Sequence, residues 1–176
     1  YLDKAKIIAP ENASVGWNTV RLKLKEQNPL EALNAARGIS RRFPDNVEGM
    51  GVLGACLRAN GEIVESLEVL NRAIELNPDY AEALINRALI RLSQENKLEA
   101  LADLELAHRL KPYVKQIWDL IISLRIECSQ FADAIVLLDE MIKGDPSDAQ
   151  RYAKKALCHQ NLKDLDMAIE TYNKAI

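Results

Sequence analysis

Residues 65–78 read ESLEVLNRAIELNP, and residues 99–112 read EALADLELAHRLKP. Both segments end in proline, and five of the six prolines of the chain recur with one constant spacing, at Pro10, Pro44, Pro78, Pro112 and Pro146. A fixed recurrence of this kind indicates an array of structural repeats. The spacing therefore predicts one supersecondary unit in every 34-residue period.

Each period contains the pattern of two α-helices. Twelve residues before the proline stands a small residue, which lets two helix backbones approach closely, and an apolar residue follows it, as at Ala100 and Leu101. Apolar residues recur at helical spacing, Gly61 and residues 94–96 form tight turns, and the recurrent prolines end the second helices. The predicted first helices are 14–26, 47–60, 81–94, 115–128 and 149–162, and the predicted second helices are 29–42, 63–76, 97–110, 131–143 and 165–176.

This register resembles the tetratricopeptide repeat (TPR) family over the whole chain. The family places a bulky residue, leucine, a small residue and tyrosine in the first helix, then a small residue, an aromatic, alanine and proline. Residues 47–80 give, at these positions, Met50, Leu53, Gly54, Leu57, Ser66, Leu70, Ala73 and Pro78. The resemblance implies an all-α fold, an α-solenoid of antiparallel helix hairpins wound into a right-handed superhelix.

The period divides the chain into repeats, which we expect to form one continuous array and a piece of a longer chain. Repeat 13–46 departs most from the family pattern, with Gly16 at the bulky position and Trp17 one place late, so its first helix is expected to pack irregularly or to present Trp17 differently. The predicted units are the tail of a preceding second helix at 1–12, four repeats at 13–46, 47–80, 81–114 and 115–148, and an incomplete repeat at 149–176.

Composition excludes several classes of function. The formal net charge is −3, so the chain lacks the basic excess of a nucleic-acid binder. No apolar run approaches the length of a membrane span. The three cysteines, Cys56, Cys128 and Cys158, cannot all pair and form no CxxC motif, which favours a reducing compartment, most simply the cytoplasm.

No pattern of catalytic residues emerges. The two histidines, His108 and His159, lie in different repeats without metal-ligand spacing around them, and no nucleotide-binding or nucleophile motif is present. Cys56 and Cys158 share a repeat position that is apolar elsewhere, which is typical of inert core cysteines. We therefore predict no catalytic, cofactor or metal site within these residues, and no enzyme activity of their own.

The resemblance implies that the first helices line a concave face on which a protein or peptide binds. An exposed apolar strip commonly marks a partner site, and Gly51 and Ala55 are expected to leave room for a partner backbone. The inward positions are apolar in the middle and only sparsely charged, and they include Glu82, Asp119, Gln150 and Lys154. The predicted binding residues are Trp17, Asn18, Val52, Ala55, Ile85, Asn86, Leu89 and Leu120.

Two specialised modes of binding in the family can be compared with these positions. The clamp that holds a terminal carboxylate is rejected, because Gly51, Ala55 and Leu120 stand where its polar and basic groups are needed. An asparagine ladder that grips peptide backbone, as in O-linked N-acetylglucosamine transferases, is matched only by Asn18 and Asn86.

The leading interpretation is a protein-interaction scaffold. One alternative is the substrate-recruiting region of a larger transferase, of glycosyltransferase or sulfotransferase type, with its catalytic domain outside this segment. Another is a scaffold that self-associates through the ends of the array.

Overall fold

The computed structural model describes residues 13–175, which fold into α-helices joined by short turns, with no strand in that range. The chain divides into two compact units, Tyr1–Leu110 and Lys111–Ile176. The expected helix tail at 1–12 lies outside the described residues.

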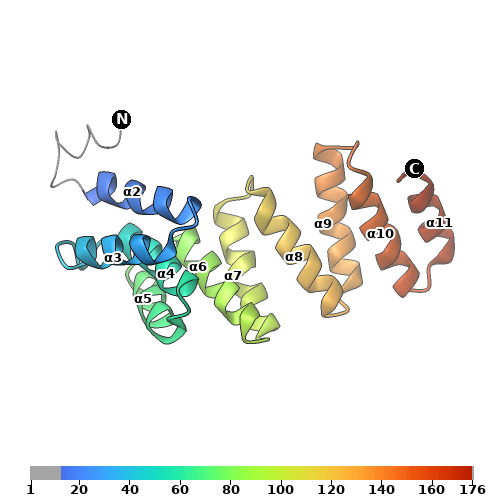
Figure 1. Cartoon of the computed structure of the whole chain (residues 1–176). Coiled ribbons are helices and arrows are strands. Elements are labelled where there is room, and N and C mark those ends of the chain that lie inside the picture. Colours follow the sequence, from blue (N-terminus) through green and yellow to red (C-terminus); the bar gives the residue numbers. More distant parts are fainter. Residues whose placement is uncertain (1–12, 176) are drawn as a thin grey trace. The chain divides into compact units, whose positions relative to one another are not determined.

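The first unit contains three consecutive helix hairpins (Figure 1). Each first helix packs against its own second helix, and the first helices also contact one another from hairpin to hairpin. The helices are α2 (Ala13–Lys25), α3 (Pro29–Ser40), α4 (Val47–Ala59), α5 (Ile63–Leu76), α6 (Ala81–Ser93) and α7 (Lys97–Leu110).

The second unit contains two hairpins. Figure 1 shows α9, α10 and α11 side by side, and contacts join α8 to α9, α9 to α10 and α10 to α11. The helices are α8 (Lys115–Glu127), α9 (Phe131–Gly144), α10 (Ala149–Asn161) and α11 (Leu165–Asn173). All predicted helices are present with bounds that differ by one or two residues, except that α11 ends at Asn173 rather than at the end of the chain.

The turn inside each hairpin has the same construction. A backbone N–H donates to the carbonyl five residues earlier, as from Glu62 to Leu57 at 2.9 Å and from Gln130 to Arg125 at 2.7 Å. This Schellman motif needs a left-handed residue just past the first helix. The chain places one there once in each period, with positive φ at Gln27, Gly61, Glu95, Ser129 and Lys163.

The small residue of each second helix lies at a close helix–helix contact. Ala32, Ala100 and Ala134 are fully buried. Ser66, also fully buried, donates its hydroxyl to the carbonyl oxygen of Gly54 at 2.7 Å, which satisfies a polar group inside the α4–α5 contact. The small residues that the sequence pattern singles out are therefore buried inside the hairpins.

Trp17 corrects a prediction, because its side chain is fully buried in the core of the first unit instead of facing a partner. Its indole covers Gly49 of α4, where an added Cβ would lie 2.2 Å from the ring. Because Gly49 has no side chain, the indole can rest directly on the α4 backbone. The irregular register of α2 is therefore resolved by packing Trp17 between α2 and α4.

The α6–α7 hairpin contains a buried ion network. Asp103, whose side chain is only 6% exposed, accepts two hydrogen bonds from Arg87, at 2.7 and 2.9 Å, and one from Arg91 at 2.6 Å. Arg87 and Arg91 occupy positions where the family has apolar or aromatic residues. Asp103 supplies the charge that lets both arginines enter the hairpin.

Candidate functional site

A small hollow lies on the face formed by the first helices of the first unit, α2, α4 and α6. Its volume is about 80 Å³. All the lining residues lie on a first helix or just before one: Arg21, Leu24, Gly51, Val52, Ala55, Tyr80, Glu82 and Asn86.

Tyr80 covers much of this hollow. A Cβ added at Gly51 would lie 2.5 Å from the tyrosine ring, so the ring occupies the space that glycine leaves open. Its hydroxyl donates weakly to the Glu48 carbonyl oxygen at 3.4 Å, and burial raises the pKa of Tyr80 to about 12. The expected room for a partner backbone at Gly51 is therefore filled by the protein itself.

Polar groups rim the same hollow. Arg21 pairs with Glu48 at 2.7 Å and donates to the Asn18 side-chain oxygen at 3.2 Å. The predicted binding residue Asn18 is exposed, but its oxygen already accepts this hydrogen bond. Asn86 donates from Nδ2 to the Glu82 carbonyl oxygen at 2.9 Å. Its Oδ1 has no donor among residues 13–175 and can accept an N–H from outside.

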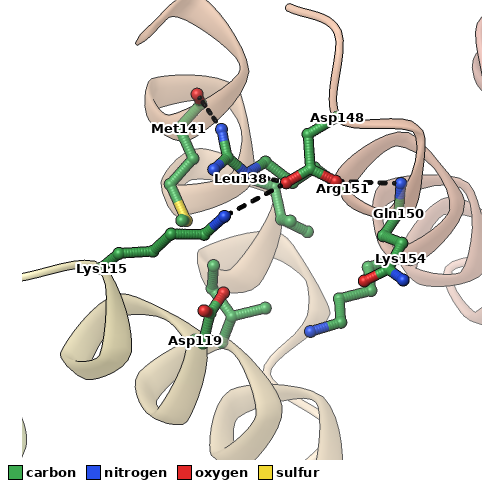
Figure 2. A pocket seen from close by; sticks show the side chains of 9 residues that line it. Lys115, Asp119, Leu138, Met141, Asp148, Gln150, Arg151 and Lys154 are labelled. Carbon is green, nitrogen blue, oxygen red and sulfur yellow. Dashed lines mark hydrogen bonds and ion pairs between the residues drawn. The ribbon is translucent and has the colours of Figure 1, made fainter. Parts of the chain in front are cut away.

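A larger hollow, of about 250 Å³, lies in the second unit between α8 and α10 and is shown in Figure 2. Ile122, Leu138 and Met141 form its apolar floor. Three cations and two carboxylates contribute to its lining, together with one amide: Lys115, Arg151, Lys154, Asp119, Asp148 and Gln150.

Asp148 organises the charges on one side of this hollow. As the N-cap of α10 it accepts the backbone N–H of Gln150 at 3.1 Å, and its other oxygen lies 3.0 Å from Arg151 Nε and 3.6 Å from Lys115 Nζ. Arg151, whose side chain is 9% exposed, also donates to the Met141 carbonyl oxygen at 2.7 Å. A cation at this end of α9 complements the negative end of the helix dipole.

The two hollows occupy the same place in the repeat. Gly51, Tyr80, Glu82 and Asn86 line the first, and the residues two full periods later line the second: Asp119, Asp148, Gln150 and Lys154. The register predicts Asp119, Gln150 and Lys154 as inward positions, but the predicted binders are mostly apolar. Tyr80, Lys115, Asp148 and Arg151 were not predicted, although the repeat register relates Tyr80 to Asp148.

The other predicted binding residues lie on the first helices with differing exposure. Val52 and Ala55 line the first hollow, but Val52 is only 5% exposed and serves mainly as core. Ile85 and Leu89 of α6 and Leu120 of α8 are half-buried and line neither hollow.

His159, Cys56 and Cys158 lie outside both hollows. Within residues 13–175, no group of three or more His, Cys, Asp or Glu side chains is placed to hold a metal ion. His159 is buried with Nδ1 3.6 Å from Asp164. Cys56 and Cys158 are buried thiols, and burial raises the pKa of Cys56 to about 12. None of the helices in this range is long and apolar enough to span a bilayer.

Comparisons with known proteins agree with this architecture. Two family models match, one described as "TPR repeat" at residues 54–94 and one as "Tetratricopeptide repeat" at residues 149–176. A search of curated proteins finds no match.

Solved structures share the fold. MamA from Desulfovibrio magneticus RS-1 aligns with a TM-score of 0.74 at 19% identity, over 94% of this chain and 93% of that one. YrrB, described as "a TPR protein with an unusual peptide-binding site", aligns with a TM-score of 0.76 at 15% identity, over 99% and 90%. TTC0263 from Thermus thermophilus aligns with a TM-score of 0.72 at 21% identity, over 89% and 86%.

The hairpins and their common turn define the chain as an all-α solenoid. The matched repeats and the 34-residue period then identify it as a tetratricopeptide repeat protein. Repeats of this kind form protein-interaction scaffolds.

Proposed function

We propose that the chain binds a protein or peptide segment along the face formed by its first helices, the face that the resemblance to TPR proteins implies to be concave. The observation that carries this proposal is the recurrence of a hollow at one repeat position, on α2, α4 and α6 in the first unit and between α8 and α10 in the second. A surface feature that recurs at equivalent repeat positions, here two periods apart, suits a ligand that is itself an extended chain.

The groups available in the first unit suit such a ligand. Asn86 Oδ1 is free to accept a backbone N–H, and the half-buried Ile85 and Leu89 offer apolar contact. Extended peptides carry unpaired backbone N–H and C=O groups together with alternating side chains, so both kinds of contact can form along one segment. The peptide-binding site named for YrrB, a protein with a similar fold, supports the same interpretation.

The test is selection of binders from a phage library of random dodecapeptides. We expect the double variant Ile85→Asp with Leu89→Asp to lower the affinity for the selected peptides by about 10-fold or more, which corresponds to about 1.4 kcal/mol. Asn86→Ala removes only the amide and is expected to lower the affinity less. Binding is measured by fluorescence anisotropy, and circular dichroism verifies that each variant is folded.

The matched control is Val64→Asp with Leu98→Asp, the same change at residues 73% and 69% exposed on second helices. These variants should bind as the parent does. If they abolish binding while folded first-helix variants retain it, the ligand uses the second helices and the proposal is wrong.

A further inference from the structure

The hollow between α8 and α10 contains polar side chains that the fold leaves unused. Asp119, Gln150 and Lys154 all line it, and none of their side chains has a hydrogen-bond or ion-pair partner within residues 13–175. Figure 2 shows Asp119 on α8 and Lys154 on α10 facing the same space. One carboxylate, one amide and one ammonium thus line a single hollow without a partner in the described part of the chain.

The charges around this hollow favour an anionic group. Asp148 lies 3.0 Å from Arg151 and 3.6 Å from Lys115, so its charge is already balanced. Three cations and two carboxylates line the hollow, but Arg151 also lies 3.9 Å from Asp145 just outside it. Lys154 is the lining cation that pairs with neither carboxylate. An acidic side chain can pair with Lys154, whereas a basic one would have three cations near it and only Asp119 to pair with.

Size and floor narrow the class of ligand further. The volume of about 250 Å³ is below the range of about 300–1,000 Å³ typical of pockets for drug-sized molecules. It suits one side chain and its backbone. The floor of Ile122, Leu138 and Met141 would contact the aliphatic part of that side chain.

Another hollow, of about 240 Å³, adjoins the hollow between α8 and α10 and shares Lys115, Met141 and Arg151 with it. Its other walls include Tyr113, which is 97% exposed, and Trp118, whose indole N–H donates to the Pro112 carbonyl oxygen at 2.6 Å. Aromatic rings held at a surface offer a large apolar contact area. A neighbouring apolar residue of the same ligand can reach them.

We infer that the hollow between α8 and α10 binds an acidic side chain within an extended peptide segment, and that an adjacent apolar residue of the segment contacts Trp118 and Tyr113. Lys154 pairs with the side-chain carboxylate, and Asp119 accepts a backbone N–H of the segment. This inference rests on the proposed function and specifies the partner for the second unit. Because a side-chain carboxylate supplies the negative charge, the bound segment does not have to end in a terminal carboxylate.

The experiment uses peptides from the library selection, synthesised with acetylated and amidated ends so that they carry no terminal carboxylate. We expect the selected sequences to place Asp or Glu beside an apolar residue. Lys154→Gln should lower the affinity for these peptides several-fold, and Lys154→Glu should lower it by about 10-fold or more. Lys143→Glu makes the same charge change at an exposed residue of α9 outside both hollows and should leave affinity unchanged.

A charge exchange separates direct pairing from a structural effect. Peptides whose acidic residue is replaced by lysine should bind Lys154→Glu more tightly than they bind the parent protein. If the selected peptides are indifferent to Lys154→Glu but lose affinity with Ile85→Asp and Leu89→Asp, the inference is overturned and the proposed function stands. If no peptide binds above background, both are overturned.

Discussion

The two hollows are built from equivalent repeat positions, yet the first is much smaller than the second. In the first unit Tyr80 stands just before α6, and its ring lies over Gly51. In the second unit the equivalent residue is Asp148, and Asp119 takes the place of Gly51. The volumes, about 80 and 250 Å³, follow from this exchange of a ring for a carboxylate.

The residue just before a first helix therefore decides how much of the preceding first helix remains accessible. Tyr80 makes no side-chain cap for α6 and is used as a cover, whereas Asp148 caps α10 and cannot also cover Asp119. A short polar residue is the better helix cap. Capping and covering are thus competing uses of one position.

The hairpins of the two units also differ at one pair of equivalent positions, which is charged in one hairpin and apolar in the other. The α6–α7 hairpin holds Arg87 against Asp103, whereas the α8–α9 hairpin has Ile121 and Leu137 at those two positions. Ile121 is 1% exposed, and Leu137 packs against the core of the second unit. One backbone arrangement therefore accepts either an ion network or an apolar pair.

The largest effect is expected at the ion network. Asp103→Asn leaves Arg87 without its countercharge and Arg91 with Glu99 alone, at 3.2 Å, and should lower the free energy of unfolding by about 3–5 kcal/mol. The lower end is favoured because the arginines are 17% and 22% exposed and can reach water. Asp133→Asn, which breaks the more exposed pair with Arg125, should cost below about 1 kcal/mol. Urea unfolding followed by circular dichroism compares the two, and equal costs would contradict the contrast.

A double replacement tests whether the two hairpins are interchangeable. Arg87→Ile with Asp103→Leu gives α6–α7 the residue types of α8–α9 and removes both charges together, while Arg91 keeps Glu99 at 3.2 Å. Apolar replacement of a buried pair is often neutral or stabilising, so unfolding should return to within about 1 kcal/mol of the parent. Persistent destabilisation would mean that the network has a role beyond filling this space.

An intermediate effect is expected where the tyrosine covers glycine. Gly51→Ala forces the Tyr80 ring away from a Cβ that would lie 2.5 Å from it, at a cost of about 1–3 kcal/mol. The higher helix propensity of alanine returns up to about 1 kcal/mol. Asp119→Ala at the equivalent position meets no ring and should leave stability unchanged or slightly raised. Thermal unfolding measures the stability of both variants. If the Gly51→Ala protein is as stable as the parent, the interpretation that Tyr80 covers Gly51 is wrong.

The smallest effects are expected in the turns. Gly61→Ala places a Cβ at φ 80° and should destabilise by about 1 kcal/mol. Ser129→Gly relieves the same conformation in the second unit, at φ 58°, and should stabilise by less than about 1 kcal/mol. Opposite shifts of the thermal midpoint are the expected result, and shifts of the same sign would show that the two turns are not equivalent.

Most of the fold could be predicted from the sequence because each helix follows from local patterns. Prolines, small residues and apolar spacing recur with the 34-residue period and fix the helix bounds within one or two residues through α10. The turn at Gly61 could be foreseen, but the left-handed residues Gln27, Ser129 and Lys163 have no sequence mark of their own. The Schellman bonds around them identify these turns only once the backbone is folded.

The candidate site could be predicted only in part. The register placed Asp119, Gln150 and Lys154 on the first-helix face, but it also placed Trp17 there, and Trp17 is buried. Whether a residue at an inward position is accessible depends on a neighbour at the start of the next first helix: Gly49 of α4 admits the indole of Trp17, and Tyr80, just before α6, covers Gly51. These neighbours lie about one period away in sequence, so no local pattern reveals them.

The repeat, its helices and the face on which each side chain begins follow from the amino-acid sequence alone. Which positions on that face are filled, paired or open is instead a property of the folded array. The physical reason is that secondary structure depends on residues within a few positions along the chain, whereas accessibility and charge balance depend on packing between helices. Asp103 between two arginines, and Lys154 without a partner among residues 13–175, are the two outcomes of that packing.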